Sequence, residues 1–439
     1  MNREFLNKGD CNLAYNELKN DQNNCVASMM EIKEAKKGAL NNVALTIKDV
    51  FATKDYLTRA SSLILDNFYP SYNATVVDKL INNGAVALAK VNNDELALGG
   101  TGTYSAYGLI TNPLDKTKYA GGSSSGSVAT FSKNVGIALG SDTGDSVRLP
   151  ASYCGVVGFK PSYGAISRYG MFAYASSLDT VAYFTHNVND AIVVAQNVYG
   201  LDNKDMTTVE VEINNVIKTK PNKVILLDFS EFCEAYVNDA IDQLIAKMQE
   251  KDIKVEIIKP NLDILRTIKP VYQVISFSEA SSNLANLNGV AFGNRQEGDS
   301  WEQLMHSTRS KGFGKMVQER LSLGSYFLYS ENQEELFIKA QKARRVIKNY
   351  LNELHDKADV VIYPAFGGIA PTFGSEKDYD VMNYILTGAN LAGNPSITIP
   401  LAKYQNFPFN LAIDAANYKD AQLLANAEYI EELIGEMYE

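Results

Sequence analysis

The segment GSDTGDSVR at residues 140–148 follows a short apolar run at 135–139 and carries the strongest indication of the fold. A run of that length, bounded by glycine and polar residues, is typical of a buried strand. A second segment of this kind, GGSSSGS at 121–127, precedes the same run, and a helix is expected after Ser125. Such loops gather backbone N–H groups, which suits either a phosphate group or the oxyanion of an acyl-transfer intermediate. Composition alone leaves both ligands open.

Apolar runs on either side of these loops extend the pattern into an alternation of strands and helices. A helix is expected at 75–83, where apolar residues recur at helical spacing. Between about 262 and 357 the strand patterns fade and helical patterns dominate, which indicates a mostly helical insertion. The sequence therefore predicts an α/β protein built on a sheet. Strands are expected at 43–47, 85–89, 135–139, 224–227, 360–363 and 396–399.

Composition narrows the function classes. The chain has 439 residues, of which 46% are hydrophobic and 21% charged, and a formal net charge of −10. These proportions are typical of a globular protein and exclude a disordered chain or a coiled coil. The acidic balance argues against a broad surface that binds nucleic-acid phosphates, so any RNA is expected to be held mainly by a partner.

The sequence lacks both long apolar runs and CxxC motifs. No segment has the apolar run of a secretory signal or a membrane span, which predicts a cytoplasmic protein without membrane contact. The four cysteines show no CxxC spacing, so neither a metal site nor a disulfide framework is expected.

Neither glycine-rich loop carries a nucleotide-binding motif. The Walker pattern GxxxxGK[ST] needs a lysine that both loops lack, and the glycines at 99–102 and 121–126 do not have GxGxxG spacing. Acyl transfer at a serine would need a base, and the three histidines stand in no recognisable catalytic context. A lysine can serve when burial keeps part of it neutral near pH 7. Lys48 follows the expected strand at 43–47 and is a candidate base, although such a lysine is more often a solvated strand end.

Three motifs occur in the order and approximate spacing of the amidase-signature family. They are Ile47-Lys48-Asp49, the segment at 121–127 and the segment GSDTGDSVRLP at 140–150. The continuation CGVVGFKPSYG at 154–164 also resembles that family, and the resemblance covers nearly the whole chain from residue 41 onward. It implies one large domain over residues 1–439, with a central mixed β-sheet covered by helices on both faces. It also implies a helical insertion at 262–357 and a shortened helical N-terminal segment at 1–40.

The resemblance further implies a Ser-Ser-Lys triad. Ser146 would attack an amide carbonyl, Ser123 would pass on the proton, and Lys48 would accept it. In the family the peptide bond before the relay serine is cis. The oxyanion hole would consist of the backbone N–H groups of Thr143, Gly144, Asp145 and Ser146.

Three neighbouring side chains are implied to support the triad. Asp142 and Arg148 resemble a pair that fixes the nucleophile loop, and an ordinary salt bridge describes them equally well. Ser124 is a candidate donor to the lysine or simply a turn residue. Asp145 differs from the family pattern, which usually has glycine at this position. Its carboxylate would disfavour an oxyanion if it pointed inward, so it is expected to point away.

Other segments resemble the A-subunit branch of the family, which comprises the glutaminase subunits of tRNA-dependent amidotransferases. They are SRYGMFAYASSLD at 167–179, TRSKGFG at 308–314 and LGSY at 323–326. The resemblance implies that this chain releases ammonia from glutamine for the conversion of Glu-tRNA(Gln) to Gln-tRNA(Gln). It implies a B-subunit as partner, together with a C-subunit where the complex contains one. No cofactor is expected in this chain, and ATP and Mg²⁺ are expected in the partner.

The substrate-binding residues are less regular. In the expected helix at 335–351, Arg344 falls within the apolar arc, and resemblance makes it the candidate for binding the substrate carboxylate. An internal ion pair is the alternative. Related subunits usually have an aspartate near the substrate amino group, where this chain has Tyr384 next to Asn383; Asp380 could substitute if the alignment slips. Two other functions therefore stay open, namely a free-standing amidase that acts on another small amide and an inactive scaffold subunit.

Overall fold

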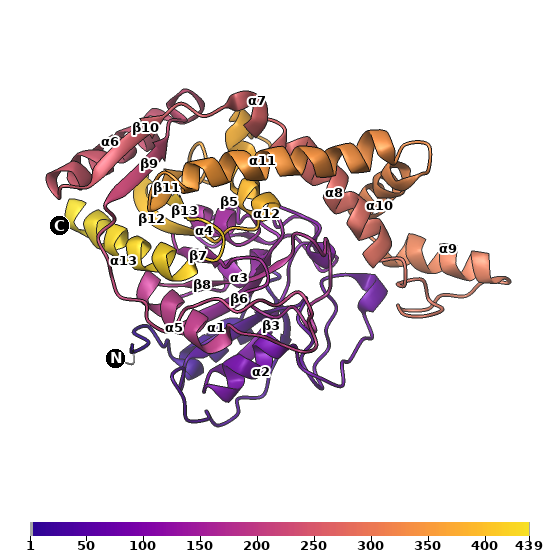
Figure 1. The fold of residues 1–439 in the computed structure, drawn as a ribbon. Coiled ribbons are helices and arrows are strands. Elements are labelled where there is room, and N and C mark those ends of the chain that lie inside the picture. Colours follow the sequence, from indigo (N-terminus) through magenta and orange to yellow (C-terminus); the bar gives the residue numbers. More distant parts are fainter. Residues whose placement is uncertain (1–2, 439) are drawn as a thin grey trace.

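The computed structural model describes residues 3–438, and its centre is one mixed sheet of eleven strands (Figure 1). Parallel pairing joins β3, β2 and β6, and again β11, β9 and β10, while the strands between these groups pair antiparallel. In order across the sheet, the strands are β1 (Val26–Met29), β3 (Val86–Val91), β2 (Ala44–Lys48), β6 (Ile137–Asp142), β8 (Thr180–Thr185), β7 (Val157–Lys160), β12 (Ser396–Tyr404), β13 (Phe407–Asp414), β11 (Val360–Pro364), β9 (Lys223–Leu227) and β10 (Lys254–Ile258). A separate hairpin consists of β4 (Thr111–Asn112) and β5 (Asp115–Tyr119).

Both faces of the sheet are covered, because successive side chains of a strand point to opposite faces. In β8, Val181 and Tyr183 belong to one hydrophobic core cluster, while Ala182 and Phe184 belong to another. Side chains of α2, α5 and α13 join the first cluster, and side chains of α1 and α3 join the second. The expected α/β class with a covered mixed sheet is therefore confirmed.

The helices alternate with the strands along much of the chain (Figure 1). Their bounds are α1 (Cys11–Lys19), α2 (Thr75–Asn82), α3 (Ser125–Ala129), α4 (Arg148–Cys154), α5 (Val188–Val198), α6 (Ala235–Glu250), α7 (Leu262–Leu265), α8 (Ile268–Asn283), α9 (Trp301–Gly312), α10 (Lys315–Leu328), α11 (Lys339–His355), α12 (Gly388–Ala392) and α13 (Asp420–Met437). No helix within residues 3–438 is long and apolar enough to cross a lipid bilayer.

The segment between Leu262 and Lys357 contains α7 to α11 and no strand, which is the pattern expected for the insertion. In Figure 1, α8, α10 and α9 extend to one side of the sheet. The helix expected at 335–351 begins later, because residues Glu334–Ile338 form one π-helical turn before α11.

The N-terminal segment differs from its expected helical character. It contains α1, but it also contains β1, which pairs antiparallel with β3 at the edge of the sheet. The four residues of β1 are all half-buried, so they lack the alternation of buried and exposed positions by which a strand is recognised in a sequence.

Candidate active site

Lys48 lies at the carboxyl end of β2 and is fully buried. Its Nζ is 2.7 Å from Ser123 Oγ, 3.0 Å from Ser124 Oγ and 2.9 Å from Ser141 Oγ. Ser124 Oγ donates to the carbonyl oxygen of Ser141 at 3.2 Å, so it accepts from the lysine. A protonated lysine has three donors and no acceptor, and loss of one proton leaves two N–H groups and a lone pair. When Ser124 and Ser141 accept those two N–H groups, the lone pair is left for the hydroxyl of Ser123.

The surroundings of Lys48 favour this neutral form. Burial lowers the pKa of Lys48 to about 7, against the opposing charges of Asp94, Asp142 and Asp179. Near pH 7 a substantial share of the amine is therefore unprotonated, which is what a base requires.

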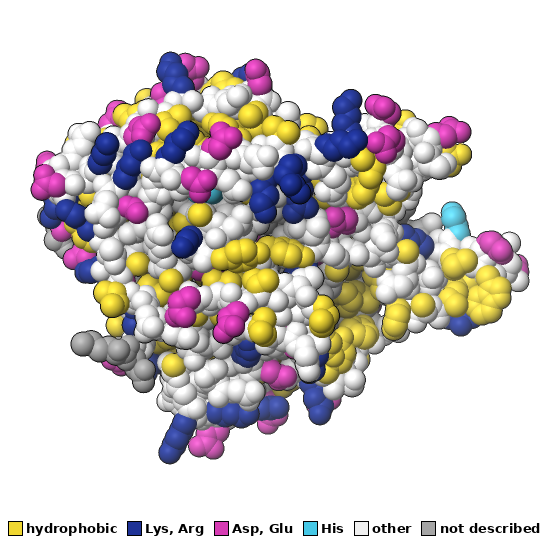
Figure 2. Space-filling model, viewed as in Figure 1, with side chains coloured by type: hydrophobic (Ala, Val, Ile, Leu, Met, Phe, Trp, Pro, Cys, Tyr) yellow, Lys and Arg dark blue, Asp and Glu magenta, His cyan; other side chains and the backbone are white. Residues whose placement is uncertain are grey.

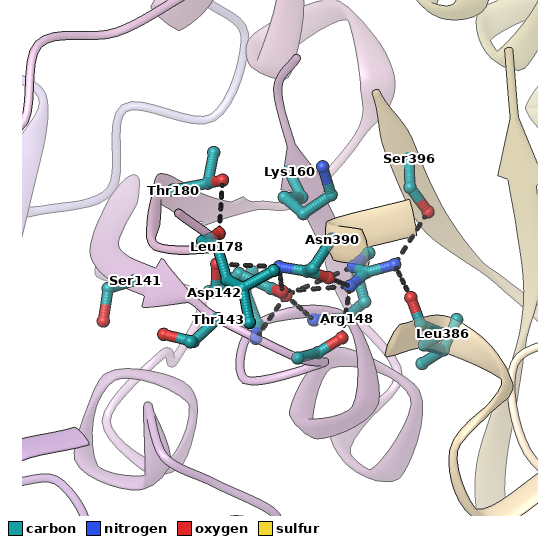
Figure 3. A network of polar contacts seen from close by, with 12 residues as sticks. Ser141, Asp142, Thr143, Arg148, Lys160, Leu178, Thr180, Leu386, Asn390 and Ser396 are labelled. Atoms are coloured by element: carbon teal, nitrogen blue, oxygen red, sulfur yellow. Dashed lines mark hydrogen bonds and ion pairs between the residues drawn. The ribbon is translucent and has the colours of Figure 1, made fainter. Parts of the chain in front are cut away.

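The loop that carries Ser146 joins the end of β6 to the start of α4 (Figure 3). Asp142 is the last residue of β6 and Arg148 the first of α4, and these buried side chains form an ion pair at 2.9 Å. Asp142 Oδ2 also accepts the N–H of Val147 at 3.0 Å, and Arg148 donates to the carbonyl oxygen of Gly144 at 2.8 Å. The two ends of the loop are thus tied to each other and to its interior.

Further contacts fix Arg148 against the second half of the chain (Figure 3). Its guanidinium donates to the carbonyl oxygen of Leu386 at 2.7 Å and to Asn390 Oδ1 at 2.6 Å. Asn390 Nδ2 donates to Asp142 Oδ1 at 3.0 Å. Burial raises the pKa of Asp142, but the charge and hydrogen bonds of Arg148 outweigh burial, and the pKa lies below its usual range.

Replacement of Arg148 by methionine is expected to destabilise the fold by about 3–5 kcal/mol, because Asp142 would be left as a buried charge without its partner. The free energy of unfolding and the Tm, measured by denaturant and thermal unfolding, check this value. Arg345→Met removes an exposed arginine of α11 and should change stability by less than about 0.5 kcal/mol. Equal stability of Arg148→Met and the wild type would contradict the structural role of the pair.

The loop between the paired ends holds four successive backbone N–H groups that donate no hydrogen bond within residues 3–438. A tight loop of free N–H groups beside a serine can stabilise an oxyanion. The Thr143 side chain is held by a 2.7 Å hydrogen bond to Asp179 Oδ1, which fixes the start of the loop. The four groups belong to Thr143, Gly144, Asp145 and Ser146.

The loop that carries Ser123 lies against the loop that carries Ser146. The N–H of Ser124 donates to the carbonyl oxygen of Ser146 at 3.2 Å. The peptide bond between Gly122 and Ser123 is cis. Only glycine fits at position 122, because a Cβ there would lie 2.1 Å from Asp94 Oδ2. Lys48 and the loops that carry Ser123 and Ser146 therefore meet, although they come from three separate segments.

A cavity of about 570 Å³ opens beside this loop. Two of its lining residues, Gly144 and Asp145, immediately precede Ser146, so a small ligand in the cavity would lie beside the loop that carries Ser146. The lining also includes Tyr272, Arg320, Asn383, Tyr384 and Thr387.

Asp145 was expected to point away from the site, and it is one of the residues that line the cavity. The residue is half-buried and lines the cavity, and no described residue donates a hydrogen bond to its carboxylate. Its φ is not positive, so the backbone does not require glycine at this position. Burial raises the pKa of Asp145 to about 7, with a further contribution from the charge of Asp142.

Arg344 lies on the inward side of α11, as the helical pattern predicts, but the structure does not place it at the cavity. Its Nε donates to the carbonyl oxygen of Leu391 at 2.8 Å, and its Nη1 donates to Ser177 Oγ at 2.8 Å. These contacts hold the guanidinium within the fold, and Arg344 is not among the residues that line the cavity. The arginine in the cavity lining is Arg320 of α10, which the sequence did not single out.

Tyr384 and Asn383 do line the cavity, as expected for candidate substrate-binding residues. The Lys269 Nζ lies 4.8 Å from the centre of the Tyr384 ring. Asp380 does not substitute for the missing carboxylate, because it is exposed and pairs with Arg266 at 2.6 Å.

Three other polar residues near Lys48 and the Ser146 loop were not predicted from the sequence. Ser141 lies within the quoted motif, but nothing in the pattern indicated its contact with Lys48. Asp94 is buried and accepts hydrogen bonds from the N–H groups of Thr101, Gly102 and Tyr104. The signal for Asp94 was a polar run, NNDE at 92–95, directly after a buried strand. Asp179 could have been found because it is the last residue of the segment 167–179, which resembles the A-subunit branch.

Among residues 3–438, no group of three or more His, Cys, Asp and Glu side chains lies close enough to hold a metal ion. The four cysteines are free thiols.

The class of protein follows from this fold and from comparison with known families. The chain matches the family "Amidase" over residues 11–424 and belongs to that family. It is an amidase-family enzyme, in agreement with the motifs around Lys48, Ser123 and Ser146.

Within the family, the chain is similar to the A-subunit of glutamyl-tRNA(Gln) amidotransferase. It is 36% identical to that protein of Thermoanaerobacter pseudethanolicus over 417 residues, which cover 92% of this chain and 85% of the relative. It is 37% identical to the Campylobacter curvus protein, over 89% of this chain and 88% of the relative. The crystal structure of the Thermotoga maritima protein superposes with a TM-score of 0.80 at 33% identity and covers 96% of this chain and 90% of that one.

Proposed function

We propose that this chain is the glutaminase subunit of a tRNA-dependent amidotransferase, which releases ammonia from glutamine for the conversion of Glu-tRNA(Gln) to Gln-tRNA(Gln). The observation that carries the proposal is its similarity, over about nine-tenths of its length, to the A-subunits of glutamyl-tRNA(Gln) amidotransferases. The buried Lys48–Ser123 contact supplies the chemistry, because it provides a base beside a nucleophile loop.

In the proposed mechanism, Ser146 Oγ attacks the side-chain carbonyl carbon of glutamine. The proton of Ser146 passes to Ser123 Oγ, and the proton of Ser123 passes to the lone pair of Lys48 Nζ. The free N–H groups of residues 143–146 stabilise the resulting oxyanion. When the intermediate collapses, the C–N bond breaks and Lys48 returns the proton through Ser123 to the leaving nitrogen, which departs as ammonia. The product is an ester of Ser146.

Water then attacks this ester along the same route. Its proton passes through Ser123 to Lys48, and on collapse of the second intermediate the proton returns to Ser146 Oγ. Glutamate leaves and the three side chains are restored. This cycle uses each group as both an acid and a base, so a lysine that titrates near pH 7 suits both directions of transfer.

Arg320 is the residue we assign to the α-carboxylate of glutamine. It lines the cavity, and within residues 3–438 its guanidinium donates one hydrogen bond, to Tyr174 Oη at 3.3 Å. A cation with unused donors in a cavity can bind a carboxylate through paired hydrogen bonds.

Arg320→Ala is therefore expected to raise the glutamine KM by about 10- to 100-fold with a smaller change in kcat, because it removes binding rather than chemistry. Steady-state ammonia release over a range of glutamine concentrations measures both constants. Arg344→Ala serves as the comparison, since it should lower the Tm and leave KM nearly unchanged. A rise in KM for Arg344→Ala with a normal KM for Arg320→Ala would place the carboxylate at Arg344 instead.

The complex is proposed to contain a B-subunit, together with a C-subunit where the complex has one, and to work in the cytoplasm. ATP and Mg²⁺ would act in the partner, which activates the glutamate on the tRNA. The partner would also hold the tRNA. On the face drawn in Figure 2, Lys and Arg side chains lie scattered among Asp and Glu rather than in one basic patch. The net charge of −10 agrees with this assignment.

The test is ammonia release from glutamine, asparagine and simple amides, with and without the partner subunits and charged tRNA. The proposal expects glutamine to be preferred and its hydrolysis to rise when the partner and charged tRNA are added. An enzyme that hydrolyses another amide at full rate, indifferent to both additions, would be a free-standing amidase.

A further inference from the structure

The cavity beside Ser146 contains one carboxylate without a protein partner. Three carboxylate residues line it, Asp145, Glu376 and Asp378. Glu376 accepts hydrogen bonds from the Tyr119 hydroxyl and from the N–H of Gly374. Asp378 accepts from Asn383 Nδ2 and from a backbone N–H. Within residues 3–438, Asp145 alone of the three forms neither a side-chain hydrogen bond nor an ion pair.

The cavity also contains cations that no carboxylate neutralises. Among the described residues, neither Arg320 nor Lys269 lies within ion-pair distance of an acidic side chain, whereas Lys377 pairs with Glu234 at 2.6 Å. The cavity thus presents an unpaired negative group in the loop that carries Ser146 and unpaired positive groups on α8 and α10. A ligand with one ammonium and one carboxylate group matches this arrangement of charge.

Because of its position, a negatively charged Asp145 carboxylate without a cationic partner would destabilise the oxyanion during catalysis. Asp145 directly precedes Ser146, and its own N–H is one of the four free groups in the loop. A negative charge at this place opposes the oxyanion that those N–H groups stabilise. A substrate ammonium group on the carboxylate removes that opposition, so the same contact helps binding and chemistry.

We propose that Asp145 binds the α-ammonium group of an amino-acid amide substrate, and this inference rests on the proposed function. Asp145 is then a specificity-determining residue, because it favours amides that carry an amino group over amides of the same chain length that lack one. Burial raises the pKa of Asp145 to about 7, because it disfavours the charged form. An ammonium group of the ligand would stabilise that form.

The experiment compares matched amide pairs that differ only in the amino group. The first pair is glutamine and 4-carbamoylbutanoate, and the second is asparagine and 3-carbamoylpropanoate. Ammonia release by the full chain, in complex with its partner subunits, gives kcat/KM for each amide. The readout is the ratio of kcat/KM between the amino and the deamino member of a pair.

The variants are Asp145→Asn, which keeps the shape of the side chain, and Asp145→Gly, which removes the side chain. Both are expected to lower the ratio by about 10- to 100-fold, because a charge-assisted contact is lost. Asp378→Asn is the matched control, since it removes a carboxylate from the same cavity and should leave the ratio unchanged. The Tm of each variant verifies that it is folded.

The outcomes separate this proposal from the proposed function. An unchanged ratio in both Asp145 variants, an equal fall in Asp378→Asn, or a wild type without preference for the amino member overturns the role of Asp145. A wild type that ignores glutamine overturns the glutaminase function. In that case, a ratio for the asparagine pair that falls in the Asp145 variants still supports the binding role.

Discussion

Ser146→Ala is expected to reduce ammonia release from glutamine by about 10⁴- to 10⁶-fold. Loss of the nucleophile removes the ester intermediate, and only the oxyanion N–H groups and substrate binding would remain to accelerate the reaction. Structural damage should be small, because alanine keeps the backbone of the loop and the Asp142–Arg148 pair is untouched. The measurement is steady-state ammonia release, combined with mass spectrometry of the protein after reaction with a serine-directed covalent reagent.

The wild type should gain one label on Ser146, and the variant should gain none at that position. Ser132→Ala is the matched control, since Ser132 lies outside the cavity lining and its hydroxyl contacts Glu17. That control should label and turn over as the wild type does. Turnover of Ser146→Ala near the wild-type rate would identify the chain as using another nucleophile, and a wild type without label or turnover would fit an inactive scaffold.

The family and the positions of the candidate catalytic residues could be predicted from the sequence because these residues lie in continuous motifs. Lys48, Ser123 and Ser146 each stand at the end of a strand or in a glycine-rich loop, where local residue order largely determines the backbone. Parallel pairing of β2 and β6 brings their carboxyl ends to the same edge of the sheet, so Lys48 and the start of the nucleophile loop meet.

The residues that line the cavity could not be predicted in the same way. The helical pattern identified the inward side of α11, but it did not indicate which residues that side contacts. Arg344 donates hydrogen bonds to Ser177 and Leu391 and does not line the cavity. Arg320 reaches the cavity because α10 packs against α8, a tertiary contact that leaves no trace in local spacing. The place of Asp145 in the cavity lining likewise depends on the packing around the loop rather than on the motif.

Lys48→Met is expected to lower kcat for glutamine by about 10²- to 10⁴-fold or more, because general-base catalysis typically contributes this much. In the wild type, kcat should rise with pH through about 7 and then level off. The pKa of Lys48 is lowered to about 7 by burial, and the neutral form accepts the proton. The variant should lose this rise. Methionine fills the buried volume of the lysine, so the fold should persist, which thermal unfolding can verify.

The folding stability should respond to pH with a definite sign. The pKa of Lys48 is lower in the folded chain than in the unfolded chain, so between pH 7 and about 10 the unfolded chain binds more protons. Stability contributed at this position therefore rises as pH rises through that window, and Lys48→Met should flatten the rise. Unfolding curves at several pH values measure it. The structural and catalytic consequences of the same titration can thus be compared in one variant.

A second buried lysine makes the assignment testable, because burial lowers the pKa of Lys160 to about 7 as well. Lys160 Nζ donates to the carbonyl oxygens of Pro161 and Asn394 and contacts neither serine of the proposed relay. Lys160→Met should therefore keep the pH dependence of kcat, although it should flatten the stability curve in the same way as Lys48→Met. If the rise of kcat near pH 7 were lost in Lys160→Met and kept in Lys48→Met, Lys48 would not be the base.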